Sequence, residues 1–329
     1  MDKNVGIQYL RAICALVVYF SHYVMAINNP VINAFRLTRW SFIVDGSIAV
    51  CIFFVLSGFF YYNNRGFEIG KYLKGVKRKT FRIYPAHIIM LLLGWMLAEC
   101  RFDWDVTSFT EWGNMFWVGD ITFSDFLNSA SCLLIKLANE KINPSMWYLE
   151  YEVWLFLIMP FIVGFINRIG WKWSWGLLVL GIVALFADLR MYHLLYVVAV
   201  CCMGVLARYL CHLYEFKFLE NKKYLTLWIF MAILLIVHNY FGAGNMFMFF
   251  RGIGSAMLVI VFWKCHFAST KLYFLEFLGC ISFEFYVVQH ISLLAFRPCF
   301  VNPIVYLILT LTITIVVAWL LNRYVTLKW

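Results

Sequence analysis

The first apolar run of the chain, L-R-A-I-C-A-L-V-V-Y-F-S-H, contains two ionisable side chains, Arg11 and His22. An ionisable group in hydrocarbon is costly, so each one found in such a run is a candidate functional residue. On a helix, their 11-residue separation places the two side chains within about 20° of one face and about 16 Å apart along the axis. Histidine changes its protonation near neutral pH, so His22 is a candidate general base. In the alternative interpretation, Arg11 extends to the lipid head groups and His22 bonds a neighbouring helix.

Polar side chains enter apolar runs again at two later places. The run N-P-S-M-W-Y-L-E-Y-E contains Trp147, Glu150 and Glu152, and an interfacial belt of aromatic residues explains the tryptophan but not the carboxylates. The run L-G-C-I-S-F-E-F-Y-V-V-Q-H places Tyr286 and His290 on one helical stripe. A polar stripe at that depth must face protein or water instead of lipid. These side chains are therefore further candidates for an intramembrane site.

A cluster of cations precedes the third apolar run. In K-R-K-T-F-R-I-Y-P, Lys79 and Arg82 stand three residues apart on one helical face, which suits a phosphorylated ligand. In the alternative interpretation, these cations only keep this loop on the cytoplasmic side of the membrane. Ser57, which is followed by a glycine, lets helices approach closely.

The predicted depths divide these candidates into two sets. The cytoplasmic set is Arg11, Ser57, Lys79 and Arg82. The outer set is His22, Glu152 and His290. A ligand whose phosphates bind inside and whose reactive end reaches into the membrane fits both sets. Acyl-CoA has that shape.

The composition indicates what kind of protein positions these residues. Of the 329 residues, 64% are hydrophobic and 13% are charged, against roughly 25% charged in a soluble domain. A membrane-spanning helix needs about 20 mostly apolar residues, so the apolar content suffices for about ten crossings of a lipid bilayer. The net charge of +10 does not indicate a nucleic-acid partner, because the basic residues lie in short loops that set orientation. The ten cysteines are scattered without a C-x-x-C pair, and we expect no metal site.

We predict an all-α, polytopic transmembrane helix bundle that occupies residues 1–329 as a single membrane domain. The ten predicted spans are 7–27, 43–62, 82–99, 147–166, 173–189, 191–209, 225–241, 246–263, 278–296 and 303–321. With the N-terminus inside, 18 basic residues fall in inner segments and eight in outer segments, in agreement with the positive-inside rule. Both termini are therefore predicted to be cytoplasmic. Residues 124–137 are predicted to be re-entrant or interfacial, and the first span is expected to be retained.

Four motifs, taken in order, resemble those of the acyltransferase family 3 membrane proteins, the multi-span O-acyltransferases of bacterial surface polysaccharides. They are Arg11 and His22 with ten residues between them, F-F-V-L-S-G-F at 53–59, R-I-Y-P at 82–85 with W-x-L-x-x-E at 147–152, and L-G-x-I-S-x-x-x-Y-x-x-x-H at 278–290. The resemblance implies a bundle of about ten helices, an acyl-CoA donor, most often acetyl-CoA, and a carbohydrate hydroxyl as acceptor. It also implies that Arg11 and His22 are essential and that Arg82 and its neighbour belong to the donor site.

Two departures from the family pattern affect what can be carried over. Cys51 stands where relatives often have an acidic residue before F-F-V-L-S-G, so any role of that carboxylate is absent. An arginine pair before I-x-P appears here as Lys79 and Arg82, which keeps the charge but loses one bidentate phosphate contact. Many relatives also carry a C-terminal extramembrane domain, which we do not expect in this chain.

We therefore expect a multi-pass O-acetyltransferase of the bacterial inner membrane that moves an acetyl group from acetyl-CoA to a cell-surface carbohydrate or its lipid-linked precursor. The expected site residues are His22, Arg11 and Glu152 for catalysis, Lys79, Arg82 and Ser57 for the donor, and His290, Tyr286 and Trp147 for the acceptor. Direct transfer and an acyl-enzyme route both stay open. A transporter or flippase of a glycan or small solute is the alternative, because buried ionisable residues suit it equally, although no matching broken helices are visible in the two halves.

Overall fold

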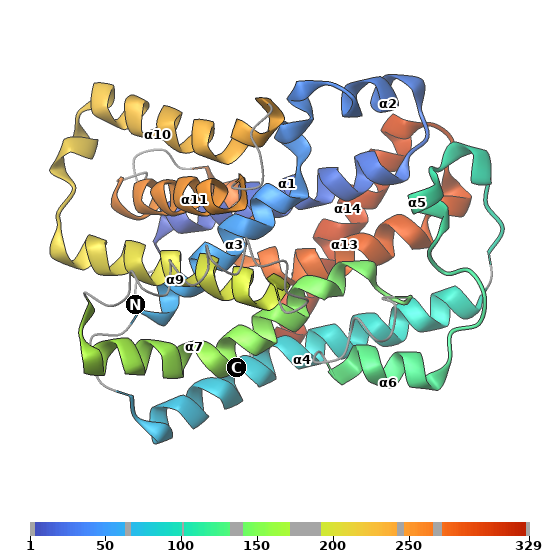
Figure 1. The fold of residues 1–329 in the computed structure, drawn as a ribbon. Coiled ribbons are helices and arrows are strands. Elements are labelled where there is room, and N and C mark those ends of the chain that lie inside the picture. Colours follow the sequence, from blue (N-terminus) through green and yellow to red (C-terminus); the bar gives the residue numbers. More distant parts are fainter. Residues whose placement is uncertain are drawn as a thin grey trace. The chain divides into compact units, whose positions relative to one another are not determined.

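The computed structural model describes residues 4–62, 67–100, 102–131, 141–171, 192–241, 247–265 and 272–326. The described residues are helical and form no strand, apart from an isolated bridge between Ile27 and Phe109 (Figure 1). The prediction of an all-α protein is therefore confirmed. The chain divides into two compact units, one of residues 1–14, 47–73 and 155–279 and one of residues 15–46, 74–154 and 280–329. Below they are called the first unit and the second unit.

Six helical segments of the described chain are long and apolar enough to cross a membrane. They are Val5–Ala26, Arg39–Tyr61, Ile69–Glu99, Pro144–Ile169, Leu194–Leu213 and Pro303–Thr326. The helices α12 (Tyr273–Cys280) and α13 (Ser282–Ala295) meet the same criteria together as one broken span. A multi-pass membrane protein is thus confirmed, while the count of ten spans and the cytoplasmic termini stay predictions. The predicted span 173–189 lies outside the described residues.

The first unit contains α3 (Gly46–Tyr61), α9 (Tyr192–Leu213), α10 (Lys222–Val237) and α11 (Phe247–Lys264). In it, α11 packs against both α9 and α10 (Figure 1). Helices α3 and α9 touch through glycine, since a Cβ atom built on Gly58 would lie 1.8 Å from the carbonyl oxygen of Cys201. A Cβ atom on Gly204 would lie 1.9 Å from the carbonyl oxygen of Val55. The predicted close approach at the S-G pair of the F-F-V-L-S-G-F motif is therefore confirmed.

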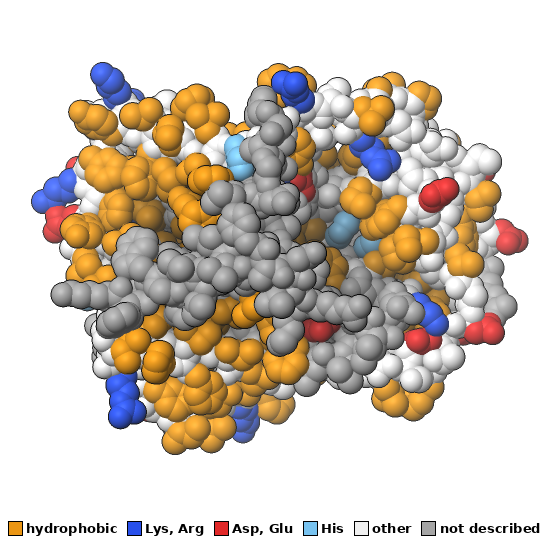
Figure 2. All heavy atoms as spheres, in the orientation of Figure 1, with side chains coloured by type: hydrophobic (Ala, Val, Ile, Leu, Met, Phe, Trp, Pro, Cys, Tyr) orange, Lys and Arg blue, Asp and Glu red, His pale blue; other side chains and the backbone are white. Residues whose placement is uncertain are grey.

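The surface of α10 is apolar. Its exposed side chains include Leu227, Phe230, Met231, Ile233 and Leu234, and hydrophobic atoms gather over the region of α10 and α11 in the view of Figure 2. A contiguous apolar surface of this kind is unfavourable in water and favourable in lipid. The exposed face of α10 is therefore consistent with the membrane prediction, although this helix has only 16 residues.

In the second unit, α13 forms the core beside α14 (Pro303–Leu321). Twelve of the 14 residues of α13 are buried, and a helix that is buried all round belongs to the interior of its unit. The hydroxyl of Tyr306 on α14 donates to the carbonyl of Leu293, and the Tyr19 hydroxyl of α1 (Val5–Ala26) lies 2.7 Å from the Thr310 hydroxyl. These bonds fix α14 against α13 and the second half of α1.

The segment that follows α4 (Ile69–Glu99) is anchored on the end of α1. Thr110 caps α5 (Glu111–Asn114), and its hydroxyl donates to the carbonyl oxygen of Met25 at 2.6 Å while its amide donates to that of Ala26 at 2.9 Å. Gly113 packs against the same turn, since a Cβ atom there would lie 2.5 Å from the Ala26 oxygen. Further along, the first part of the segment 124–137, which was predicted to be re-entrant or interfacial, lies in α6 (Phe123–Ser131). Its residues 132–137 lie outside the described chain.

Two arginines that the charge count assigns to outer segments, Arg251 and Arg297, are buried. Arg251 lies within α11, is 4% exposed and donates to the Ser47 hydroxyl at 2.6 Å. Arg297 lies in the turn Arg297–Cys299 after α13 and is 2% exposed. The charge count treats each cation as solvated, whereas the polar groups of these two side chains bond to protein. Their side of the membrane stays a prediction.

Candidate active site

His22 and His290 lie in contact in the second unit. Their ring centroids are 4.9 Å apart, with His22 on α1 and His290 on α13. Trp112 of α5 stacks on His22 at 5.9 Å with an interplanar angle of 19°, and its ring lies 5.1 Å from that of His290. The edge of Phe116 closes the cluster 5.2 Å from His290. The structure thus brings together the expected base, His22, and an expected acceptor-binding residue, His290. We call the rings of Trp112 and Phe116 around them the aromatic cage.

The imidazole of His22 makes no hydrogen bond among the described residues. Its Nδ1 atom is buried and has no partner among the described residues. A buried polar atom without a partner is uncommon and calls for a physical reason. Here the aromatic neighbours hold the His22 ring in place, and its Nδ1 atom makes no hydrogen bond to the described residues. That arrangement suits a group that must receive a proton from a bound hydroxyl.

His290 is connected to the segment just before α7 (Trp147–Ile169). Its Nδ1 atom lies 3.1 Å from the Ser145 hydroxyl, and the Tyr286 hydroxyl donates to the Ser145 carbonyl. Asn143 donates to the carbonyl of Val287 at 2.9 Å. Ser145 has no exposed surface, and these bonds hold its short turn against α13. The expected acceptor residues His290 and Tyr286 therefore meet at one serine.

Glu152 lies beside Lys79 and Tyr148. Its Oε1 atom is 3.6 Å from the Lys79 ammonium, and its Oε2 atom accepts a long hydrogen bond of 3.4 Å from Tyr148. The ring of Tyr148 in turn meets that of Tyr286 edge-on at 5.4 Å. The prediction that places Lys79 on the cytoplasmic side and Glu152 on the outer side is therefore wrong for this pair. The apolar run predicts where α7 begins along the chain, but the depth of that residue in the membrane depends on how α7 packs.

Contacts run without interruption from one end of this cluster to the other. They join the His22 and His290 rings, then Ser145, Tyr286, Tyr148, Glu152 and Lys79. All of these residues belong to the second unit. We call this series the polar column.

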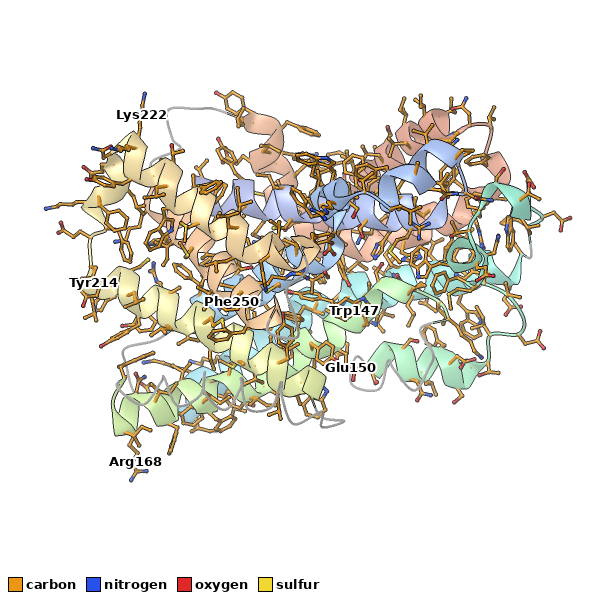
Figure 3. All side chains as sticks on the ribbon, turned by 45° about the horizontal axis from the view of Figure 1, so that its top comes forward. Trp147, Glu150, Arg168, Tyr214, Lys222 and Phe250 are labelled. Atoms are coloured by element: carbon orange, nitrogen blue, oxygen red, sulfur yellow. The ribbon has the colours of Figure 1, made fainter. Side chains whose placement is uncertain are left out.

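The remaining expected site residues lie outside the column. Arg82 is exposed on α4, one turn after Lys79. Trp147 is partly exposed at the start of α7, near Glu150 and at the end opposite Arg168 (Figure 3), and its ring meets that of Tyr151 at 6.2 Å. Arg11 and Ser57 are partly exposed and belong to the first unit. Within the second unit, the structure therefore assembles His22, His290, Tyr286, Glu152 and Lys79, and leaves Arg82 and Trp147 outside this set.

Three members of the site were not predicted from the sequence. Ser145 follows the N-P pair before W-Y-L-E, so it lies next to a motif that was singled out. Trp112 and Phe116 lie in a segment that carries no membrane span and no motif, and only its two aromatic residues four positions apart distinguish it. Their role depends on the fold of α5 onto α1, which no local pattern reports.

The buried cation Arg297 bonds to the segment that carries the aromatic cage. Arg297 donates from Nη1 to the Gly113 carbonyl at 3.0 Å and from Nη2 to the Phe116 carbonyl at 3.2 Å, and its guanidinium lies 3.7 Å from the centre of the Trp104 ring. Burial lowers the pKa of Arg297 to about 10, so the group stays cationic at neutral pH. Arg297 therefore fixes the segment that supplies Trp112 and Phe116. Within the described residues, no three His, Cys, Asp or Glu side chains converge on a position that could hold a metal ion.

Comparison with protein families gives one result that covers nearly the whole chain. The model of a family described as an acyltransferase domain matches residues 4–323. Comparisons with curated proteins and with solved structures give no match. The matched region includes every residue of the polar column.

Proposed function

The chain belongs to this acyltransferase family, and we propose that it is a membrane O-acetyltransferase of the bacterial inner membrane. In this proposal, acetyl-CoA donates an acetyl group to a hydroxyl of a cell-surface carbohydrate or its lipid-linked precursor. One observation carries it above the others: the ring contact of His22 with His290, inside an aromatic cage and with a buried, unpartnered Nδ1 on His22 among the described residues. The polar column from that contact to Lys79 adds support.

His22 acts as the general base in this mechanism. The sugar hydroxyl gives its proton to Nδ1 of His22 while its oxygen attacks the thioester carbonyl carbon, forming the new C–O bond. The C–S bond then breaks, and the CoA sulfur leaves as a thiol with that proton. His290, whose Nδ1 lies 3.1 Å from the Ser145 hydroxyl, and Tyr286 hold the acceptor or stabilise the oxyanion. An acyl-enzyme route would use the same base.

The donor is held from α4. Arg82 is exposed, and its guanidinium suits a CoA phosphate. Lys79 shares its charge with Glu152 at 3.6 Å, so it contributes to the same phosphate site less strongly than an unpaired cation would. Glu152 in this arrangement positions Lys79 and Tyr148. The roles of Arg11, Ser57 and Trp147 are proposed on the family resemblance.

The proposal is tested by replacing the two histidines in purified full-length protein. His22→Gln keeps the approximate size of the side chain but does not accept a proton at neutral pH, so acetyl transfer should fall by about 10²–10⁴ while acetyl-CoA binding is retained. His290→Gln is the matched control, since its ring touches the same cage, and it should lose less. Transfer is measured as labelled acetate incorporated into deacetylated surface polysaccharide.

Two results would contradict the proposal. Near-normal transfer by a folded His22→Gln protein would remove the base from the mechanism while leaving the family assignment intact. Failure of the unmodified protein to bind acetyl-CoA at all would instead favour the transporter alternative.

A further inference from the structure

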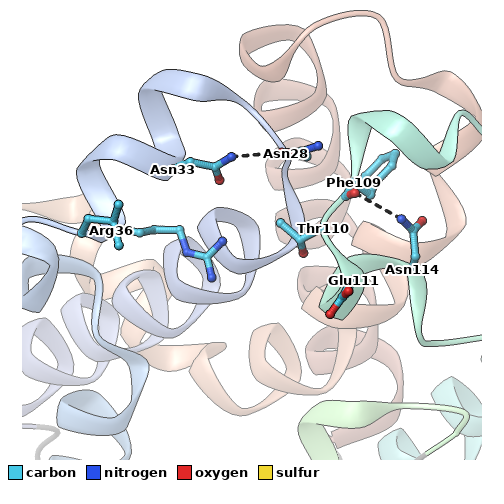
Figure 4. Close-up of a pocket in the computed structure, with 8 residues that line it drawn as sticks. Asn28, Asn33, Arg36, Phe109, Thr110, Glu111 and Asn114 are labelled. Carbon is cyan, nitrogen blue, oxygen red and sulfur yellow. Dashed lines mark hydrogen bonds between the residues drawn. The ribbon is translucent and has the colours of Figure 1, made fainter.

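An open groove of about 740 Å³ lies in the second unit, between α2 (Pro30–Arg36) and the segment that leads into α5 (Figure 4). Its polar lining residues are Asn28, Asn33, Arg36, Thr110, Glu111 and Asn114. A groove of this volume is in the range of small-molecule sites, and six of its eight lining residues carry polar side chains, which could orient a polar ligand. None of its residues belongs to the polar column.

The amide side chains build the walls of the groove. Asn33 donates to the Asn28 side-chain oxygen at 3.0 Å, and Asn28 donates to the Thr107 carbonyl at 2.9 Å (Figure 4). Asn114 donates to the Phe109 carbonyl at 3.1 Å and accepts from a tryptophan. Because these amides are already bonded within the protein, the walls are fixed before a ligand arrives.

Arg36 and Glu111 are the charged groups of the lining, one on each wall. Neither side chain makes a hydrogen bond or an ion pair with the described part of the chain. A guanidinium offers five N–H donors, and a carboxylate offers only acceptors. A ligand that contacts both needs an acceptor for Arg36 and a donor for Glu111, and the hydroxyls of a sugar offer both.

The segment that leads into α5 connects the groove to the candidate base on α1. Glu111 lines the groove, and the next residue, Trp112, stacks on His22. Thr110, also in the lining, bonds the carbonyls of Met25 and Ala26, which follow His22 on α1. A chain of sugars seated in the groove therefore lies next to the aromatic cage.

We propose that this groove binds the glycan acceptor, holding sugars that neighbour the one to be acetylated, with Arg36 and Glu111 as its recognition pair. The inference rests on the proposed function and adds to it a binding subsite outside the reacting centre. Binding there is remote from the bond being formed, so it acts on acceptor affinity more than on the chemical step.

The test compares two double variants of the full-length protein in detergent. Arg36→Gln with Glu111→Gln removes both groove charges. Arg39→Gln with Asp103→Asn is the matched control, since it makes the same change of net charge at exposed residues outside the lining. The probe is the surface polysaccharide of the producing cells, deacetylated by mild alkali, with labelled acetyl-CoA as donor.

The groove variant should raise the apparent KM for the polysaccharide by about tenfold or more, because charge-assisted hydrogen bonds are lost. Its KM for acetyl-CoA and the control's KM for polysaccharide should not change. An unchanged polysaccharide KM in the groove variant overturns the inference while the proposed function stands. If the unmodified protein transfers no acetyl group, the proposed function fails, and direct binding of the same polysaccharide to both double variants then decides the groove by itself.

Discussion

Replacement of Arg297 tests how the aromatic cage is held. The guanidinium is 2% exposed, donates to the carbonyls of Gly113, Phe116 and Leu294, and stacks on Trp104 at 3.7 Å. No carboxylate lies within ion-pair distance of it among the described residues. Its charge is therefore satisfied by backbone carbonyls and an aromatic ring, and these are the groups that fix the segment around α5.

The size of the effect follows from these contacts. In Arg297→Met, each carbonyl left buried without a donor costs about 1–3 kcal/mol, and loss of the desolvated cation–π contact costs about 2 kcal/mol. Removal of a buried charge returns part of this, because its desolvation is no longer needed. The net loss should be about 3–5 kcal/mol. Arg297→Lys keeps the charge but not the planar fork, so its loss should be about 1–3 kcal/mol.

The assay pairs thermal unfolding in detergent with acetyl transfer. Arg323→Lys is the control, because Arg323 also lies over an aromatic ring, at 5.4 Å from Trp319, but is exposed. We expect the control to change stability by less than about 0.5 kcal/mol. Arg297→Lys should lower kcat while leaving the KM for acetyl-CoA unchanged, since Trp112 and Phe116 shift against the two histidines. Equal unfolding temperatures and equal kcat for the two lysine variants would refute this account of the cage.

Two further predictions concern the donor site and the helix contact in the first unit. Neutralising Lys79 and Arg82 together should raise the KM for acetyl-CoA more than it lowers kcat, because phosphate binding is remote from the reacting bond. An unchanged KM in a folded protein would mean that these cations serve only to orient the chain in the membrane. Gly58→Ala should lower the free energy of unfolding by about 3 kcal/mol or more, since its Cβ would lie 1.8 Å from the Cys201 carbonyl oxygen. Gly75→Ala, where nothing lies within 4 Å of the new atom, should instead stabilise α4 by about 0.5–1 kcal/mol. Thermal unfolding that ranks the two alanine variants the other way would contradict the close contact.

Much of the helical architecture could be predicted because apolar run length is a local property. The predicted spans 7–27, 43–62 and 303–321 all correspond to helical segments of spanning length. The predicted span 82–99 covers only the second part of α4, which begins at Ile69. Hydropathy detects only the part of a helix that lies in lipid, while lysine and arginine, which are good helix formers, extend it further. The break at Ile281 between α12 and α13 was missed because window hydropathy measures how apolar a run is and does not report a bend between two helices.

The candidate site was predictable to the extent that its residues are out of place in hydrocarbon. His22, Glu152 and His290 stand out because ionisable groups are rare in apolar runs, and all three belong to the polar column. Trp112 was not identified, because an aromatic residue next to a membrane segment has an ordinary interfacial explanation. The burial of Arg297 was not predicted, because nothing in its local sequence shows that three carbonyls and a ring lie within reach.

The packing of α4 in the second unit bears on the length of the proposed donor. Side chains near a Cβ atom built on Gly94 include Ile142 and Ile291, and Lys79 lies beside Glu152. Since Lys79 and Gly94 are 15 residues apart on α4, these two contact points lie about 22 Å apart along the helix. His290 precedes Ile291 directly, so the histidine pair belongs to one end of this interval and the Lys79 cluster to the other. A donor whose phosphates bind at Lys79 and Arg82 must therefore carry its acetyl group on a long, narrow arm to reach His22. Acetyl-CoA has such an arm, whereas a compact donor such as acetyl phosphate is too short to occupy both ends.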